Sequence, residues 1–562
     1  MTKFRFNSLQ VFTFSISLFL TIYILYRTQI NNGFLFLLGD NTYDNTIHTA
    51  ILEHWFNVAK GINTWSEVNY FYPYTKTIAQ TDAYFLVSFF YIPFRVFGYD
   101  PYLATEFAGI GLKIFGFIFA YLFSKIVVNF QHRYALLVAI LFSLNNAMSI
   151  HGYRIQLATV AFVPALGLLI YLTIKYLKLG NRFFFTTYGT ISGVFFGLWC
   201  FTCFYASYFF FLQLFIFSII FVALNFKAFR IYLSQILQLR RQVFAVAFFS
   251  ALSLMPFIFT FYPKSKESNQ RSFEAILSST APLEEILEVG SNNIFNYPIY
   301  QQVVAFISPN YIPRSNWEYY NNGFTILIFL IFTLSVIYLL INVKKHRYNS
   351  IFLMGLSSII LILLIVNFKG FSLWKYIYEF FPAGKALGVI STGLIFVSFP
   401  IYVTAIYFLT RLRNNLPIFI FISVLLILSE VNSPALKLDR KTEVNKNFTI
   451  SNPALLCDSF YVSGWINQET TPGYWEWFNN QYAHNVSAML LSQKLNIPTI
   501  NGMASFIPKN YDLVGPNGTA FSPNSQEYQN RVNNYILKFK LENVCRIDLN
   551  TKEWVTHQNF AF

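Results

Sequence analysis

The stretch Gly39-Asp40-Asn41-Thr42-Tyr43-Asp44 places two carboxylates directly after the first apolar run of the chain, residues 9–28. A carboxylate is costly at membrane depth, so it persists near the hydrocarbon only with a partner or a chemical task. The four-residue spacing of Asp40 and Asp44 predicts that they share one face of a helical turn, where they bind a divalent cation (Mg²⁺ or Mn²⁺) or act as a general base. A plainer interpretation makes Asp40 the N-cap of a helix that continues through residues 47–59. Both interpretations remain open, and we favour a catalytic role.

The composition identifies the chain as an integral membrane protein. Of its 562 residues, 55% are hydrophobic and 20% aromatic, and only 12% are charged. Soluble domains carry about 25% charged residues. The net charge of +15 does not indicate a nucleic-acid partner, because much of the Lys and Arg lies in short loops on one side of the predicted membrane helices. We therefore predict membrane lipids, and no nucleic acid, as partners.

About eleven apolar runs are long enough, or nearly so, to cross about 30 Å of hydrocarbon. A further apolar segment, 83–98, is interrupted by Pro93, Arg95 and Gly98, and we interpret it as an interfacial helix. The predicted crossings lie near 9–28, 102–128, 134–150, 156–177, 183–205, 206–226, 243–262, 322–342, 350–367, 386–409 and 415–431.

The loop charges predict the orientation. Clusters of Lys and Arg precede the first run and then recur at alternate loops, which places the N-terminus in the cytoplasm. An odd number of crossings then puts the loop 30–100 and everything after about 432 outside. The predicted organisation is a transmembrane domain, 1–431, and a small extracytoplasmic α/β or mixed domain, 432–562. We favour a bacterial inner (plasma) membrane.

The four cysteines do not form a disulfide framework. Cys200 and Cys203 lack a second ligand pair, so we do not predict a metal site there. Cys457 and Cys545 both lie in the tail, and the sequence leaves open whether they pair. Also in the tail, we expect the segment 484–487 to form a buried strand, with a turn at 497–502.

Four further residues of the first outer segment are candidates for substrate binding. Glu53 and His54 follow the acidic motif, and a lone His is more often a surface or capping group than a ligand. Asp82 precedes the interfacial segment, where N-capping is its default role. Arg95 within that segment is a candidate phosphate ligand.

A late outer loop contains Lys369, Lys375 and Lys385, which run against the predicted charge asymmetry. Lysine serves as a point-charge partner for phosphate, so these residues are candidates for binding an anionic substrate group. Ordinary headgroup contacts or snorkelling explain them equally well.

A membrane protein with an acidic motif after its first membrane helix, a long first outer loop and an extracytoplasmic C-terminal domain resembles the GT-C superfamily of glycosyltransferases. The segment from Glu53 through Phe71-Tyr72-Pro73-Tyr74 to Asp82 also resembles bacterial membrane proteins of this type. The resemblance implies that Asp40, and less directly Asp44, is the catalytic base or metal ligand. It also implies that basic residues of late outer loops bind the lipid phosphate.

The implied activity is inverting transfer of a sugar from a polyprenyl-phosphate donor to a glycan, lipid or protein acceptor of the cell envelope. No second carboxylic acid is required, because a phosphate leaves well as an anion. One alternative is a lipid or oligosaccharide flippase or transporter, which internal repeats would favour, and the sequence has no such repeat. A second alternative is a membrane scaffold whose tail binds partners.

Overall fold

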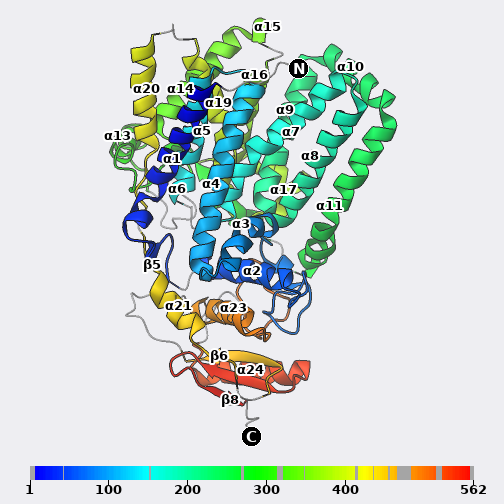
Figure 1. Cartoon of the computed structure of the whole chain (residues 1–562), viewed down its shortest axis with the longest axis vertical. Coiled ribbons are helices and arrows are strands. Elements are labelled where there is room, and N and C mark those ends of the chain that lie inside the picture. The colour runs from blue at the N-terminus through cyan, green and yellow to red at the C-terminus, as the bar shows by residue number, and fades with distance from the viewer. Residues whose placement is uncertain are drawn as a thin grey trace. The chain divides into compact units, whose positions relative to one another are not determined.

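The computed structural model is mostly helical and divides into two compact units. Unit 1 comprises Met1–Ile30, Gly109–Met255 and Gln270–Ala435, and unit 2 comprises Asn31–Ala108, Pro256–Asn269 and Leu436–Phe562. Figure 1 labels the elements of both. The structure describes residues 7–41, 44–150, 154–267, 271–312, 321–346, 349–411, 415–434, 436–453, 456–464, 482–513 and 522–556.

Unit 1 contains most of the long apolar helices, some of whose ends belong to unit 2. A short sheet pairs β2 (Ala281–Pro282) in parallel with β3 (Val366–Phe368), which pairs antiparallel with β4 (Phe371–Ser372). The α-helices are α1 (Ser8–Asn31), α4 (Pro101–Ile126), α5 (His132–Leu144), α6 (Asn146–Ile150), α7 (Phe162–Lys178), α8 (Arg182–Thr202), α9 (Phe204–Leu224), α10 (Phe226–Gln238), α11 (Arg240–Glu267), α12 (Phe273–Leu277), α13 (Tyr297–Ile307), α14 (Ile326–Ile341), α15 (Val343–His346), α16 (Ser350–Ile365), α17 (Trp374–Phe380), α18 (Gly393–Phe396), α19 (Ser398–Leu409) and α20 (Leu416–Glu430).

Every predicted crossing coincides with a helix or a pair of consecutive helices. Among the described residues, six helices are long and apolar enough to cross a membrane. A seventh crossing is added if the pair Ile390–Phe396 and Ser398–Leu409, bent by 45°, is one span. The other apolar helices, such as α14 and α16, have 10–17 residues. These helices and the composition together make the chain a polytopic membrane protein, and the count of eleven remains a prediction.

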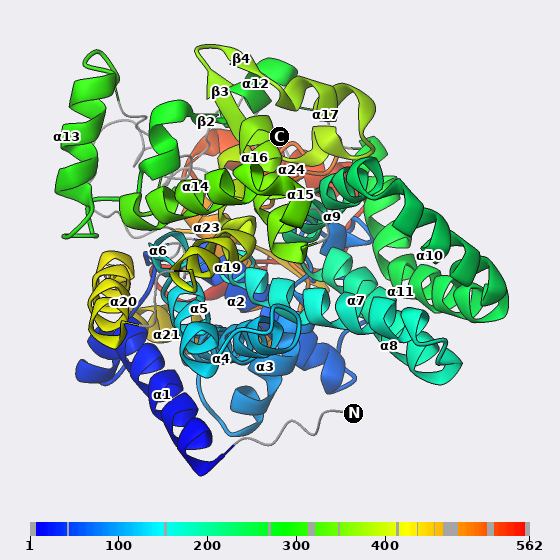
Figure 2. The same cartoon turned by 90° about the horizontal axis from the view of Figure 1, so that it is seen from above.

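Small residues bring two long helices of unit 1 close together. Gly189, Gly193 and Gly197 recur every fourth residue on one face of α8. A Cβ added at Gly193 or Gly197 would overlap a serine side chain of α11. Glycines at this spacing let apolar helices approach closely in a membrane. Figure 2 shows α7, α8, α10 and α11 gathered at one side of unit 1.

Unit 2 combines the segment after α1, Asn31–Ala108, with the C-terminal region. Its helix α2 packs against α3 and α23, and β1 pairs antiparallel with β5. The sequence division at 431 separated these parts, whereas the structure joins them because these contacts link residues far apart in the chain. The elements are β1 (Phe36–Leu37), α2 (Asp44–Ala59), α3 (Phe85–Val96), β5 (Leu438–Asp439), α21 (Arg440–Phe448), β6 (Ser459–Ser463), α23 (Ala483–Leu495), α24 (Gln526–Phe539), β7 (Val544–Asp548) and β8 (Trp554–Thr556).

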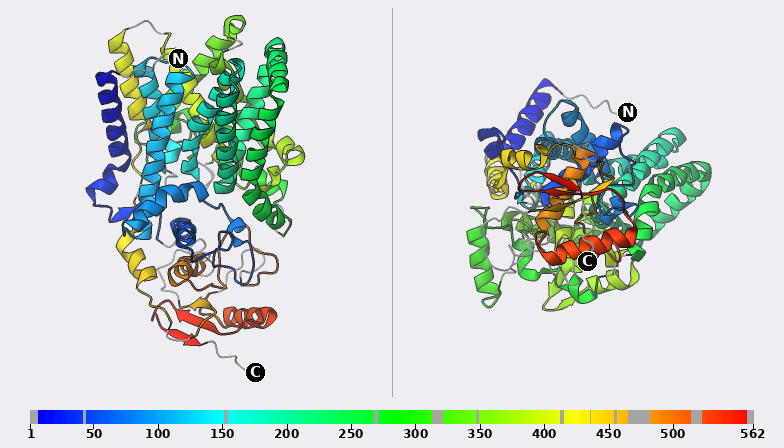
Figure 3. Two further views of the ribbon diagram at one scale, coloured as in Figure 1. Left: turned by 45° about the vertical axis from the view of Figure 1, so that its right-hand side comes forward. Right: turned by 90° about the horizontal axis from the view of Figure 1, so that it is seen from below.

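The C-terminal sheet is small and mixed. Strand β6 pairs in parallel with β7, from Ser459 opposite Val544 to Ser463 opposite Asp548, and β8 adds to β7 antiparallel. Figure 3 shows this sheet beside α24. The buried strand predicted at 484–487 is wrong, because these residues belong to α23. All but one residue of α23 are buried, and a helix buried on every side has no periodicity that distinguishes it from a buried strand.

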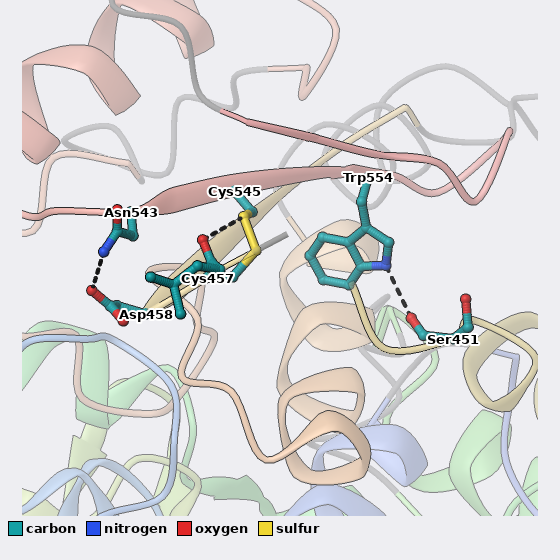
Figure 4. Close-up of a disulfide and its surroundings, with 7 residues drawn as sticks. Ser451, Cys457, Asp458, Asn543, Cys545 and Trp554 are labelled. Atoms are coloured by element: carbon teal, nitrogen blue, oxygen red, sulfur yellow. Dashed lines mark hydrogen bonds between the residues drawn. A yellow bond between two sulfur atoms is a disulfide. The ribbon is translucent and has the colours of Figure 1, made fainter. Parts of the chain in front are cut away.

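Figure 4 shows the disulfide between Cys457 and Cys545, which resolves the pairing that the sequence left open. It links the segment before β6 to β7, with the two Cα atoms 5.7 Å apart. Close by, the Asn543 amide donates to Asp458 Oδ2 at 2.9 Å, and the Trp554 indole donates to the Ser451 carbonyl at 3.0 Å. Structural disulfides persist in oxidising compartments.

Candidate functional site

Asp40 lies in a short extended segment of unit 2, with its carboxylate accessible. Residues 36–39 pair with residues 436–439, and the Asn41 side chain accepts a hydrogen bond from the Asp439 backbone at 2.8 Å. The Asp40 side chain is 48% exposed, and its Oδ1 lies 3.7 Å from Lys437 Nζ. Such an exposed ion pair is weak, so the Asp40 carboxylate remains available to another partner.

Gly39 shapes the turn between this segment and α2. Its φ is +97°, a value that side chains with a Cβ rarely adopt. An added Cβ would also overlap the side chain of Asn45, whose amide donates to the Leu38 carbonyl at 2.7 Å. Substitution of Gly39 would therefore displace the segment that carries Asp40.

Asp44 begins α2 and is half-buried. Its carboxylate accepts a hydrogen bond from the hydroxyl of Tyr482, just before α23. The helix dipole favours a carboxylate in the first turn. The expectation that Asp40 and Asp44 share a helical face is wrong, because Asp40 precedes the helix. Asp40 is not the N-cap either, since α2 begins four residues later; Thr42 and Tyr43 lie outside the described residues.

Asp40 and Asp44 are the two carboxylates predicted to hold a divalent cation. Mg²⁺ prefers six oxygen ligands, several of which are usually waters. Across the described ranges, no group of three or more His, Cys, Asp or Glu side chains is arranged to hold a metal ion. We therefore derive no chemical step through a cation, and dependence on Mg²⁺ or Mn²⁺ stays a prediction.

Glu53 and Arg95 form an ion pair between α2 and α3. Arg95 Nε donates to Glu53 Oε1, and its Nη2 lies 3.3 Å from Glu53 Oε2. The Tyr91 hydroxyl donates to the same carboxylate. Only 5% of the Glu53 side chain and 16% of the Arg95 side chain are exposed. The guanidinium predicted to bind phosphate thus already has a carboxylate partner in the fold.

His54 is buried in a network of side-chain amides. Asn63 Nδ2 lies 3.4 Å from His54 Nδ1, and the Trp65 carbonyl lies 3.4 Å from Nε2. The Asn63 amide nitrogen donates and the Trp65 carbonyl accepts, so in this arrangement the proton of the imidazole is on Nε2. Burial lowers the pKa of His54 to about 4, and the bond to Trp65 opposes this shift. Asn63 also donates to Gln493 of α23, so the histidine belongs to the α2–α23 interface.

Asp82 precedes α3 but does not cap it. The helix begins at Phe85, and its cap position is Tyr84, which has a φ of 56° and no side-chain capping bond. The capping role expected for Asp82 is therefore wrong. The Asp82 side chain is half-buried, and its role in substrate binding stays a prediction.

The three outer-loop lysines lie on three different elements of unit 1, and all are exposed. Lys369 is at the turn between β3 and β4, with a φ of 54°. Lys375, on α17, lies 3.8 Å from Glu379 in an exposed ion pair. The Lys385 ammonium lies 5.3 Å from the centre of the Tyr378 ring.

Tyr482 is the neighbour of the acidic motif that sequence reasoning missed. It lies 438 residues beyond Asp44, and no sequence motif marks it.

His484 is a buried histidine of α23. It contacts Asn485 at 3.1 Å and the ring of Tyr528. Burial lowers the pKa of His484 to about 3, so this imidazole is neutral at physiological pH.

The carboxylates of the whole sequence are confined to certain segments. All 25 Asp and Glu residues lie within 40–106, 267–318 and 430–553 or at Glu379. These are the predicted outer loops, the tail and the outer ends of adjoining helices. The acidic motif therefore belongs to the one side of the predicted topology that carries acids.

The fold defines a multi-pass membrane protein in which Asn31–Ala108 and the C-terminal region belong to one compact unit. No family model matches the sequence, and no curated protein matches it. Among solved structures, the chain is similar to the crystal structure of the Archaeoglobus fulgidus oligosaccharyltransferase in the apo form. The TM-score is 0.49 at 13% sequence identity, with 95% of this chain and 69% of that chain covered.

Proposed function

We propose that this protein is a membrane glycosyltransferase that transfers a sugar from a polyprenyl-phosphate donor to an envelope acceptor at the extracytoplasmic face. The observation that carries the proposal is the acidic motif after α1. Asp40 presents an accessible carboxylate with only a weak partner, and Asp44 is fixed nearby in sequence by the start of α2 and by Tyr482. The confinement of all acids to the predicted outer side supports the orientation, as does the disulfide of the tail.

In the proposed reaction, Asp40 acts as the general base. It takes the proton of an acceptor hydroxyl while the hydroxyl oxygen forms a bond to the anomeric carbon of the donor sugar. The bond between that carbon and the phosphate oxygen breaks on the opposite face, and the phosphate leaves with the electron pair. Transfer inverts the anomeric configuration. Lys369, Lys375 and Lys385 are the proposed partners of the phosphate, and Asp44 is the second candidate base.

A flippase or transporter would use the same charges to move the substrate without breaking a bond. A scaffold would need neither acid. A general base contributes about 10²–10⁴-fold to a rate, and this separates the three functions, because only the transferase loses a chemical step when Asp40 becomes Asn.

The test in cells compares envelope glycans by mass spectrometry in strains that produce the wild type, Asp40→Asn, Asp44→Asn or the double variant at equal membrane levels. The proposal predicts that one glycan species disappears in Asp40→Asn and in the double variant. An unchanged profile in the double variant would overturn it.

Asp512→Asn is the matched control. Asp512 is an acid of the same unit, and among the described residues its exposed carboxylate forms one ion pair, with Lys538 at 3.0 Å. This substitution removes one surface negative charge, as Asp40→Asn does, and should leave the glycan profile unchanged. Loss of the same glycan in this control would show that the assay responds to charge rather than to the proposed base.

A further inference from the structure

Helix α10 joins two candidate spans, α9 and α11, without being able to cross a membrane itself. It has 13 residues, about 20 Å at 1.5 Å per residue, against about 30 Å of hydrocarbon. One face of α10 packs against other helices of unit 1. The Tyr232 ring lies 6.0 Å from the Phe221 ring, and Ile236 packs on the cluster formed by Leu177, Phe185 and Leu239. Figure 1 shows α10 at the same end of the helices as α15.

The remaining surface of α10 is open, and part of it is apolar. None of its residues is buried. Phe226, Leu233 and Leu237 are exposed by 50%, 43% and 66%. With Arg230 they recur at intervals of four, three and four residues, which places them along one helix face. We call the three apolar residues of this face, Phe226, Leu233 and Leu237, the α10 stripe.

Positive charges surround the α10 stripe. The Arg230 guanidinium lies 4.7 Å from the centre of the Phe226 ring, and the Lys178 ammonium, at the end of α7, lies 5.0 Å from the centre of the Tyr232 ring. The exposed basic residues at these helix ends are Lys175, Lys178, Arg182, Lys227, Arg230, Arg240 and Arg241.

Among the described residues, no carboxylate forms an ion pair with these basic side chains. The sequence has no Asp or Glu between residues 107 and 266. An exposed apolar face edged by Lys and Arg is typical of a helix that lies in a membrane interface. Basic groups beside a leaflet bind its anionic lipids.

We infer that α10 and the adjoining ends of α7, α8 and α11 form a binding surface for anionic phospholipid headgroups. The α10 stripe lies among the acyl chains next to the headgroups, and the Lys and Arg side chains bind the lipid phosphates. The occupant is a lipid rather than a soluble anion, because a soluble anion would leave the apolar stripe in water. This surface is separate from the proposed transferase site, and its test does not depend on sugar transfer.

The experiment measures thermal unfolding of the full-length protein in zwitterionic detergent, with either phosphatidylglycerol or phosphatidylcholine added. For the wild type, the midpoint should rise by about 2 °C or more with phosphatidylglycerol relative to phosphatidylcholine. Added NaCl should reduce this difference. The triple variant Lys178→Gln/Lys227→Gln/Arg230→Gln should lose at least half of it. Absence of the difference in the wild type, or its full retention in the triple variant, would overturn the proposal.

Two further arms define the surface and the ligand. Lys344→Gln/Lys345→Gln, in the other exposed basic cluster on α15, should keep the difference, and an equal loss there would contradict the assignment to α10. Leu233→Gln/Leu237→Gln should reduce the response to lipid, because the stripe no longer inserts. If inorganic phosphate at the same ionic strength reproduces the full wild-type shift, the ligand is a soluble anion and the lipid assignment is wrong.

Discussion

Helices α2 and α10 both carry ionisable residues, but those of α2 lie inside the fold and those of α10 lie on its surface. In α2, Glu53 is buried and paired, and His54 is buried, neutral and hydrogen-bonded within the fold. In α10, no residue is buried, and its cations have no carboxylate partner among the described residues. Buried charges are stable only when paired, whereas exposed cations are free to bind partners outside the chain. The polar groups of α2 therefore hold unit 2 together, and those of α10 are left for external ligands.

The largest expected effect comes from breaking the buried ion pair of α2. Arg95→Met leaves the Glu53 carboxylate buried, with the Tyr91 hydroxyl as its remaining hydrogen-bond partner among the described residues. Removing one member of a buried pair costs about 3–5 kcal/mol. We expect a lower midpoint of thermal unfolding and faster proteolysis of unit 2 in the purified protein.

The double variant Glu53→Gln/Arg95→Met sharpens this prediction. It removes both charges, so it should be more stable than Arg95→Met alone. If the double variant is less stable than the wild type by the sum of the two single effects, the two side chains are not coupled, and the stabilising role given to the pair is contradicted.

The second largest effect is a pH dependence of the stability, which comes from the ionisation of His54. Its pKa in the folded protein, about 4, is below the ordinary value of 6.5, so the unfolded chain binds the proton more tightly. The contribution of His54 to the free energy of unfolding is fully present above pH 6.5. It decreases as the pH falls from 6.5 to 4, and it does not change further below pH 4. The span is about 3 kcal/mol. His54→Gln should reduce the dependence of the unfolding midpoint on pH between 7 and 4.5, and the second buried histidine, His484, should keep part of it. An unchanged slope would mean that His54 does not contribute in this range.

Lys113 of α4 differs from both helices, because its side chain is buried, as in α2, but forms no ion pair or hydrogen bond with the described residues. It is 4% exposed, and its ammonium has no hydrogen-bond partner among the described residues. Lys113→Met removes an uncompensated polar group and should stabilise the protein by about 1–3 kcal/mol. A rise in the unfolding midpoint in detergent would agree with this; a fall would show that Lys113 has a stabilising partner.

The smallest effect is expected in α10. In zwitterionic detergent without anionic lipid, Lys227→Gln/Arg230→Gln should change stability by no more than about 0.5 kcal/mol, because surface substitutions away from packed or paired groups are nearly neutral. Unfolding midpoints in the presence of denaturant measure this. A large loss of stability would show that Lys227 and Arg230 stabilise unit 1. It would contradict the contrast drawn with α2.

The membrane helices could be predicted because hydropathy is a local property. Every predicted crossing falls on a helix, although helices such as α14 and α16 are shorter than the usual span. The predicted interfacial segment 83–98 corresponds to α3. Local patterning was sufficient for these elements.

Features that depend on distant residues could not be predicted in the same way. The hydrogen bond from Tyr482 to Asp44 and the pairing of β1 with β5 join residues about 400 positions apart. The ion pair of Glu53 with Arg95 also has no local signature. The helical face assumed for Asp40 and Asp44 was wrong because α2 begins at Asp44, and a four-residue spacing implies a shared face only inside a helix.

The most direct test of the proposed function follows bond cleavage in vitro. Purified full-length protein in lipid vesicles is given a radiolabelled polyprenyl-phosphate sugar with envelope acceptors, and release of polyprenyl phosphate is measured over time. The wild type should release it with transfer of label, and Asp40→Asn should be slower by about 10²–10⁴-fold, the range for a lost general base, while Asp512→Asn keeps the wild-type rate. Equal rates for the wild type and the double variant Asp40→Asn/Asp44→Asn would contradict the account.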